Sequence, residues 1–313
     1  MEPKDRVLAA IRHERTDRTP KGEIFIDDTV VQSSLGCEKV AFEERKEFVR
    51  LLGLDLICRS PFFPPQSEKT TLPKPSEADW DDLKDWSSQT DRFIFINLDG
   101  MMGWGMKLFG FRKWMVDLSR RSPYLSDYIR AVETLNLELA VQARDLGAMG
   151  VLIADDLGYQ HGLMFSPELL QLYFFPSLAR QTETLINLGL PVFFHSDGNL
   201  NGILADLAGM NLAGLHGLED AAGMDLRSIK QQYGSRLCLW GNLDPGHLVF
   251  PRSREEIARQ VDSILKAAGR DGGFIFGTNS GLFKGVRPEN LRTIYEILAS
   301  SEVHKALSKY PKE

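Results

Sequence analysis

Short apolar runs of strand length recur along the whole chain, and each is followed by polar residues and then by apolar positions at helical spacing. Most runs are continuously apolar rather than alternating, which is typical of parallel strands that are covered on both faces. Eight such strand–helix units predict a single α/β domain folded as a closed (β/α)8 TIM barrel. No Gly-rich dinucleotide fingerprint follows the first run, so an open Rossmann sheet is disfavoured. The predicted strands are Glu23–Ile26, Leu54–Cys58, Phe93–Asn97, Val151–Ala154, Val192–His195, Leu212–Leu215, Leu237–Trp240 and Phe274–Phe276.

Capping signals mark several of the intervening helices. A long helix is predicted from Pro123 to about Gly147. Ser166 is a predicted N-cap, followed by a proline in the first turn. Ser253 begins a capping box for a helix that ends near Gly269, and Pro288 begins the last long helix.

Two segments exceed what a minimal barrel needs, and we expect both to be loops over its mouth. Residues 59–86 are rich in proline, serine and charge, whereas residues 99–114 are rich in glycine, methionine and aromatic residues. The second segment can form an apolar wall around a flat ligand, or it can be a hydrophobic plug or a patch for a partner protein. The wall residues would be Trp104, Phe109, Phe111 and Trp114.

Composition narrows the class of protein. The chain of 313 residues is long enough for a large core, and residues 1–313 are predicted to form one domain. The net charge is −6 and no basic stripe is present, which argues against a nucleic-acid partner. We find no signal peptide and no apolar run of membrane-spanning length. The three cysteines have no regular spacing, so a reducing, cytoplasmic location is expected.

Polar residues follow most of the predicted strands. In a barrel, the loops after the strand C-termini carry the chemistry, so we expect these side chains to converge at one mouth. The polar residues at the strand ends are Asp27, Asp28, Asn97, Asp99, Asp155, Asp156, His195, Asp197, His216, Glu219, Asn242, Asp244, Thr278, Asn279 and Ser280.

The sharpest motif is His195-Ser196-Asp197-Gly198. Residues two apart on an extended segment point the same way, so His195 and Asp197 can share a metal ion or a substrate group. Glu219, His216 or Asp155 can complete a zinc site. The alternative is a His–Asp hydrogen bond that only orders the loop.

Asp155 and Asp156 are adjacent, so only one of them is expected to face the mouth. That carboxyl group can have a raised pKa and act as a general acid. The other carboxyl group can cap a turn.

Several motifs together resemble the uroporphyrinogen decarboxylase superfamily, and within it the corrinoid-dependent methyltransferase branch of the O-demethylase type. The resemblance runs nearly from end to end of the chain. The motifs that carry it are Arg6–Ile11, Ala154–Gly158, Ser166–Glu168, Phe194–Asn199, Ala222–Asp225, Leu239–Asn242 and Val286–Asn290.

The departures from the family pattern bear on the reaction. Decarboxylases of the family carry an Arg-Gln-Ala-Gly-Arg stretch that grips the carboxylates of the porphyrinogen, whereas here the first predicted strand runs into Asp27 and Asp28. Coenzyme M methyltransferases hold zinc with a His-x-Cys pair and a later Cys, where this chain has His195, Asp197 and Ser280. A harder ligand set suits a cation that polarises an oxygen rather than a thiol.

The resemblance therefore implies transfer of a methyl group from a methoxylated aromatic donor to the Co(I) of a corrinoid held on a partner protein. Zinc would be held by His195, Asp197 and Glu219, while Asp155 or Asp156 would position the substrate or protonate the leaving oxygen. A homodimer is a further expectation. The alternatives are a decarboxylase or a non-catalytic barrel that binds a corrinoid or tetrapyrrole. The expected substrate contacts are Asp27, Asn97, Trp104, Phe109, Trp114, Asn242, Asn279 and Ser280.

Overall fold

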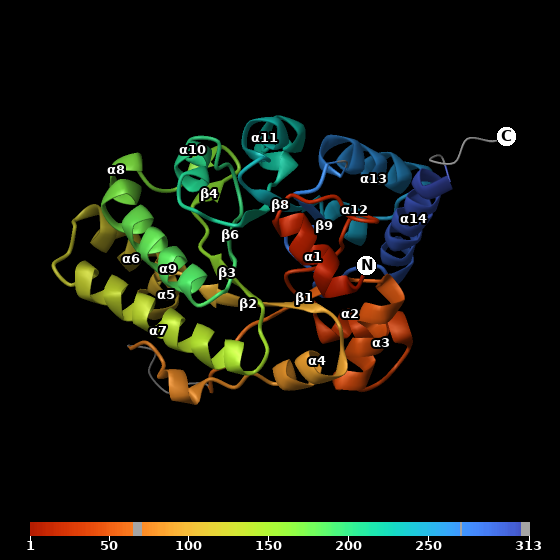
Figure 1. Cartoon of the computed structure of the whole chain (residues 1–313). Coiled ribbons are helices and arrows are strands. Elements are labelled where there is room, and N and C mark those ends of the chain that lie inside the picture. The colour runs from red at the N-terminus through yellow and green to blue at the C-terminus, as the bar shows by residue number, and fades with distance from the viewer. Residues whose placement is uncertain (65–70, 270, 308–313) are drawn as a thin grey trace. The chain divides into compact units, whose positions relative to one another are not determined.

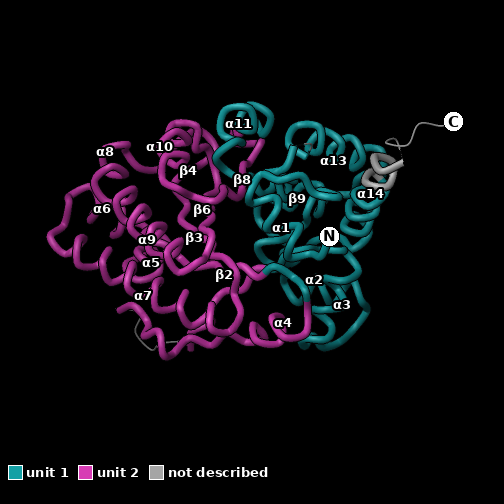
Figure 2. Tube along the Cα trace, viewed as in Figure 1, with its two compact units in different colours: residues 1–57, 91–93, 225–313 teal, residues 58–90, 94–224 magenta. Residues whose placement is uncertain are grey.

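The computed structural model describes residues 1–64, 71–269 and 271–307, with side chains described up to residue 300. This part of the chain has an α/β fold in which helices alternate with parallel strands. Two compact units can be distinguished, which Figure 2 shows in separate colours. Unit 1 comprises Met1–Ile57, Asp91–Phe93 and Asp225–Glu313, and unit 2 comprises Cys58–Thr90 and Ile94–Met224. The single domain over residues 1–313 stays a prediction.

Unit 2 contains a parallel sheet whose strands follow one another in the order β2-β3-β6-β7. Helices α7 and α9 pack against each other beside this sheet (Figure 1), and a buried hydrogen bond from Asn136 Nδ2 to Gln181 Oε1 of 2.9 Å joins them. The elements after β1, Leu56–Arg59, are η1 Pro75–Glu77, α4 Leu83–Gln89, β2 Phe93–Asp99, α5 Met101–Phe109, α6 Phe111–Ser119, α7 Leu125–Asp145, β3 Gly150–Ala154, β4 Gly158–Tyr159, β5 Gly162–Leu163, α8 Pro167–Leu169, η2 Leu170–Phe174, α9 Phe175–Asn187, β6 Val192–Ser196, α10 Leu204–Ala208, β7 Gly214–Gly217 and η3 Asp220–Ala222.

Unit 1 is organised around β8 and β9, which pair in parallel. Both strands are buried along their whole length, as expected for strands that are covered on two faces. The elements of this unit are α1 Pro3–Ile11, α2 Asp28–Leu35, α3 Phe42–Leu52, α11 Leu226–Tyr233, β8 Cys238–Leu243, α12 Gly246–Val249, α13 Arg254–Ala268, β9 Phe274–Thr278 and α14 Pro288–Leu307.

The first predicted strand, Glu23–Ile26, is wrong as a regular strand. Its segment meets β9 and the residues after it only through isolated bridges, Lys21 to Phe276 and Ile26 to Leu282. These bridges are five residues apart on one segment and six apart on the other, so no continuous ladder can form. The indole Nε1 of Trp240 donates to the Gly22 carbonyl oxygen instead, at 3.0 Å.

Each of the other predicted strands overlaps an observed strand, with ends that differ by up to three residues; the observed strands are β1, β2, β3, β6, β7, β8 and β9. The capping predictions are also confirmed: Ser166 Oγ accepts from Leu169 N, and Ser253 forms a capping box with Glu256 at the start of α13. An α/β fold with parallel strands is therefore confirmed. Closure of eight strands into a barrel stays a prediction.

The prediction of a loop is wrong for residues 99–114, whereas most described positions of residues 59–86 do lie in loops. Residues 99–114 form helix α5 and the start of α6. Residues 59–86 contain η1 and most of α4, while positions 65–70 lie outside the described residues. Glycine content suggested a loop at 99–114, but Gly105 lies in helix α5, where the indole of Trp114 packs against it and leaves no room for a side chain. An added Cβ would lie 2.3 Å from Trp114 Cε2.

Among the described residues, helices that combine the length and the apolar composition of a membrane span are not found.

Candidate metal centre and ligand cavity

The register of the sheet in unit 2 places polar residues level with one another at the carboxyl ends of neighbouring strands. Asp99 of β2 pairs with Ala154 of β3, which pairs with His195 of β6, which pairs with His216 of β7. Paired residues in a parallel sheet point to the same face. Asp99, His195 and His216 therefore share one face at this edge.

A histidine and two aspartates converge at the ends of β3 and β6. His195 Nε2 lies 4.0 Å from Asp156 Oδ1 and 3.9 Å from Asp197 Oδ1. One ligand atom from each of the three residues lies within 4.8 Å of the other two. The His195 side chain is 12% exposed and each aspartate side chain is 48% exposed, so the carboxylates open to solvent while the imidazole lies deeper.

These distances discriminate between the two interpretations of the His-x-Asp motif. At 3.9 Å the imidazole and the Asp197 carboxylate are too far apart for a hydrogen bond, so such a bond does not order this loop. Ligand atoms that are about 2 Å from a shared tetrahedral cation lie roughly 3.3 Å apart. The observed spacing is therefore close to that of a cation site.

Backbone contacts hold the two carboxylates beside each other. Asp197 N donates to Asp156 Oδ1 at 3.0 Å. Gly198 has a φ of 80° and passes so close to Gly158 that an added Cβ would lie 2.3 Å from the Gly158 carbonyl carbon. The glycine after the His-x-Asp motif is therefore required where the loops after β3 and β6 meet.

His216 lies behind His195 rather than beside the carboxylates. It is fully buried, and its Nδ1 lies 2.9 Å from Nδ1 of His195. One of these two nitrogens carries the hydrogen of the contact. When His195 carries it, its Nε2 has a lone pair that faces Asp156 and Asp197. The sequence suggested His216 as an alternative ligand, but its Nδ1 faces His195.

Glu219 lies near the three-residue group, although it is not one of its members. Its Oε2 accepts a hydrogen bond from Gly198 N at 3.2 Å. Burial raises the pKa of Asp197, the His195 charge lowers it, and the negative charges of Asp156 and Glu219 raise it. Glu219 thus adds negative charge to the site, while its role as a metal ligand stays a prediction.

Asp155 faces a different part of unit 2. It is 2% exposed and accepts a hydrogen bond from Gly103 N, in the first turn of α5, at 2.8 Å. Gly100 lies so close that an added Cβ would be 2.1 Å from Asp155 Oδ2. Burial raises the pKa of Asp155 to about 8. Of the adjacent pair, Asp156 therefore faces His195 and Asp155 contacts the start of α5.

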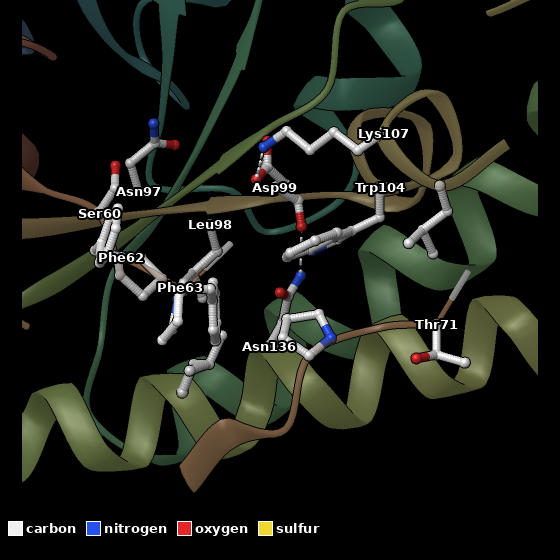
Figure 3. Close-up of a pocket in the computed structure, with 15 residues that line it drawn as sticks. Ser60, Phe62, Phe63, Thr71, Asn97, Leu98, Asp99, Trp104, Lys107 and Asn136 are labelled. Carbon is white, nitrogen blue, oxygen red and sulfur yellow. Dashed lines mark hydrogen bonds and ion pairs between the residues drawn. The ribbon is translucent and has the colours of Figure 1, made fainter. Parts of the chain in front are cut away.

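A cavity of about 500 Å³ lies in unit 2 beside the end of β2 (Figure 3). Lys107 forms an ion pair with Asp99 at this cavity, and Asn136 Nδ2 donates to the Asp99 backbone oxygen at 3.0 Å. The lining is mainly apolar and includes two of the predicted substrate contacts, Asn97 and Trp104. The lining residues are Ser60, Pro61, Phe62, Phe63, Pro64, Thr71, Pro73, Asn97, Leu98, Asp99, Trp104, Lys107, Leu108, Asn136 and Leu139.

The other aromatic residues of this region pack among themselves. The rings of Phe109 and Trp114 are stacked with centroids 5.9 Å apart, and Trp114 also contacts Tyr128 edge to face at 5.1 Å. Trp114 is fully buried. Phe109 and Trp114 are not among the residues that line the cavity by β2, so their positions support a packing role. Phe111, by contrast, is exposed.

The remaining predicted substrate contacts belong to unit 1. Asp27 is the N-cap of α2, and its Oδ1 accepts from Thr29 N at 2.7 Å. Asn242 is buried in β8, and Asn279 is buried after β9, where its Oδ1 accepts from Ser280 Oγ at 3.3 Å. Participation of these four residues in the site of unit 2 stays a prediction.

Unit 1 contains a buried carboxyl group that the sequence analysis did not single out. Glu23 is 1% exposed, and burial raises its pKa to about 7. Its oxygens accept from Tyr295 Oη and from Thr278 Oγ1, both at 2.6 Å. An acid within an apolar stretch is the only signal that the sequence offered for this network.

Comparison with solved structures shows the fold. A methyltransferase from Methanosarcina mazei has a TM-score of 0.76 at 16% identity, over 96% of this chain and 99% of that one. A B12-independent methionine synthase from Shewanella sp. W3-18-1 has a TM-score of 0.58 at 11% identity, over 94% and 100% of the two chains. At such low identity these likenesses show a shared fold only.

Comparison of sequences shows the family. Relatives named uroporphyrinogen decarboxylase include one from Photorhabdus laumondii, 30% identical over 95 residues, and one from Methylococcus capsulatus, 37% identical over 82 residues. These matches cover 29% and 25% of this chain and only 25% and 23% of the relatives. The family profile described as uroporphyrinogen decarboxylase (URO-D) matches residues 100–300, which is well over half of the chain. The chain therefore belongs to the uroporphyrinogen decarboxylase family.

Proposed function

We propose that the protein is a metal-assisted methyltransferase that moves a methyl group from a methoxylated aromatic donor to the Co(I) of a corrinoid on a partner protein. The observation that carries this proposal is the convergence of Asp156, His195 and Asp197 at the strand ends of unit 2. The shared fold with a methyltransferase supports the reaction class.

The three side chains fit a divalent cation in both chemistry and position. One imidazole nitrogen and two carboxylate oxygens form a sound zinc ligand set, and catalytic zinc sites commonly have three protein ligands. The carboxylates are half exposed, so a substrate oxygen can reach the site. Gly198 N already donates a hydrogen bond to one carboxylate oxygen of Glu219. Glu219 is therefore suited either to a place outside the metal's direct ligands or to the place of a weaker fourth ligand.

The reaction needs the bond between the methyl carbon and the ether oxygen to break with both electrons left on the oxygen. A cation in this site would supply a Lewis acid that stabilises negative charge on that oxygen. His216 holds the His195 ring, so that Nε2 faces the carboxylates. The methyl carbon forms its new bond to cobalt, and the phenolate that leaves takes a proton from water.

A decarboxylase is the second candidate, and the names of the curated sequence relatives favour it. A decarboxylase of porphyrinogens must bind many carboxylates. The site in unit 2 instead has Asp156, Asp197 and Glu219 close together, and like charges at this spacing repel an anionic substrate. The geometry therefore favours an uncharged substrate. Incubation with uroporphyrinogen, followed by analysis of the products, tests this alternative directly.

The decisive test of methyl transfer uses the purified protein, a corrinoid protein reduced to Co(I), and a panel of methoxyarenes. We expect the cobalt absorbance to change with at least one donor. The His195→Ala variant is expected to react about a hundred- to a thousandfold more slowly, as when an electrostatic stabiliser of the leaving group is lost. Absence of transfer from every methoxyarene, together with turnover of uroporphyrinogen, would reject the proposal.

A further inference from the structure

The cavity beside β2 has the size and lining of a small-molecule site. Its volume of about 500 Å³ is within the range of roughly 300–1,000 Å³ that is common for such sites. Three aromatic side chains, Phe62, Phe63 and Trp104, contribute to its wall, and the rings of Phe63 and Trp104 meet edge to face at 6.0 Å. A flat apolar molecule is the ligand that such a wall favours.

The charged residues of the lining do not offer a free charge. Asp99 and Lys107 are the charged members of the described lining, and they form an ion pair with each other. Lys107 Nζ also lies 5.2 Å from the centre of the Trp104 ring. A carboxylate ligand would have to compete with Asp99 for Lys107, and a cationic ligand would have to compete with Lys107 for Asp99. The cavity therefore favours an uncharged molecule.

Asn97 is one of three lining residues with a buried polar atom that has no hydrogen-bond partner among the described residues, the other two atoms being Trp104 Nε1 and Asn136 Oδ1. In Asn97 this atom is Oδ1. A buried polar atom without a partner costs about 1–3 kcal/mol, and a ligand hydroxyl group can remove this cost. Because the amide can turn about its last bond, Asn97 can donate to such a hydroxyl group or accept from it.

The cavity lies two strands away from the metal candidate in the same sheet. Asp99 of the lining and His195 share the same sheet face and are separated by β3 alone. Adjacent strands are about 4.8 Å apart, so the two backbones are roughly 10 Å apart.

We infer that this cavity binds the ring of an uncharged phenolic methoxyarene, with the Asn97 amide hydrogen-bonded to the ring hydroxyl group. The inference rests on the proposed function for its link to methyl transfer, and it specifies which methoxylated donors the protein accepts. Phenols have a pKa of about 10, so such a ligand is neutral at pH 7.

Equilibrium binding tests this inference without a corrinoid. The probes are 2-methoxyphenol, methoxybenzene and 3-methoxybenzoate, titrated by calorimetry at pH 7 into the parent protein and into Asn97→Leu. The parent is expected to bind 2-methoxyphenol about tenfold more tightly than 3-methoxybenzoate. Asn97→Leu is expected to weaken binding of 2-methoxyphenol about five- to tenfold and to leave binding of methoxybenzene unchanged, since only the first has a hydroxyl group.

The exposed Asn187, at the end of α9, supplies a matched control, because Asn187→Leu makes the same chemical change away from the cavity. Equal affinity of Asn97→Leu and the parent for 2-methoxyphenol would overturn the inference, as would a preference for 3-methoxybenzoate, even if methyl transfer had been demonstrated. The expected pattern of affinities would support the inference even if no methyl group reached cobalt, which would reject only the proposed function.

Discussion

The buried carboxyl group of unit 1 and the two carboxyl groups at the strand ends of unit 2 differ in what surrounds them. In unit 1, the Glu23 carboxyl group is enclosed, and donors from Thr278 and Tyr295 fill its oxygens. In unit 2, Asp156 and Asp197 approach His195 to about 4 Å and form no hydrogen bond with it. A buried carboxyl group whose oxygens already accept hydrogen bonds stabilises a fold. Ligand atoms that converge without hydrogen bonds to one another are suited to binding a cation.

The largest expected effect comes from removing both carboxylates of the convergent group. The double variant Asp156→Asn with Asp197→Asn should weaken zinc binding by a factor on the order of a thousand, because even outer-shell partners contribute 10–100-fold. Competition with a chromophoric chelator measures this affinity. Glu255→Gln with Asp262→Asn, which neutralises two exposed acids on α13, should leave it unchanged. Equal losses in both double variants would show a general charge effect.

The enclosed carboxyl group should instead control stability. Because the pKa of Glu23 is raised to about 7 by burial, the folded state holds a proton that the unfolded chain loses near pH 4.5. The contribution of Glu23 to the free energy of unfolding should therefore fall as the pH rises from 4.5 to 7, and it should change little above pH 7. The difference corresponds to roughly 3 kcal/mol at about 1.4 kcal/mol per pKa unit.

Urea unfolding of the parent and of Glu23→Gln at pH 5 and pH 8 measures this contribution. The neutral amide should remove the part of the pH dependence that Glu23 contributes and should leave the zinc affinity unaltered, whereas the part from Asp155, whose pKa burial raises to about 8, should remain. A parent and a variant with the same pH dependence would show that Glu23 is charged in the folded protein.

A smaller effect is expected at His216, which contacts His195 and is not a member of the three-residue group. His216→Leu should weaken zinc binding about 10–100-fold, as losses of ring-orienting partners do. His216→Asn places a polar atom near the former Nδ1 and should retain most of the affinity. If both variants lost zinc equally while the metal-free proteins unfolded at the parent's temperature, an orienting role through the Nδ1 contact would be excluded.

The sequence predicted the strands well because continuous apolar runs depend on local composition. The prediction failed at Glu23–Ile26. The indole of Trp240 donates to the carbonyl oxygen of the preceding Gly22, which a continuous strand would have used to pair with its neighbour. The prediction also failed at residues 99–114, where the glycines were interpreted as loop residues. There, Gly105 gives room to Trp114 and Gly100 gives room to Asp155, and both are tertiary contacts that a sequence pattern does not encode.

The candidate site was predicted in part. His195 and Asp197 were paired correctly because their spacing on an extended segment is local. Asp155 or Asp156 was expected to act on the substrate, and the place of Asp156 beside His195 follows from the register of β3 against β6. The sequence also left open which of the adjacent aspartates faces the strand ends, since this depends on where β3 ends.

The central claim is that His195 holds a divalent cation together with Asp156 and Asp197. Its most direct test is the metal content of the protein after equilibration with zinc and removal of the excess, measured by mass spectrometry of the elements. The parent should retain about one zinc ion per chain and His195→Ala essentially none, with both proteins folded by circular dichroism. The same zinc content in both proteins, whether one ion or none, would contradict the claim.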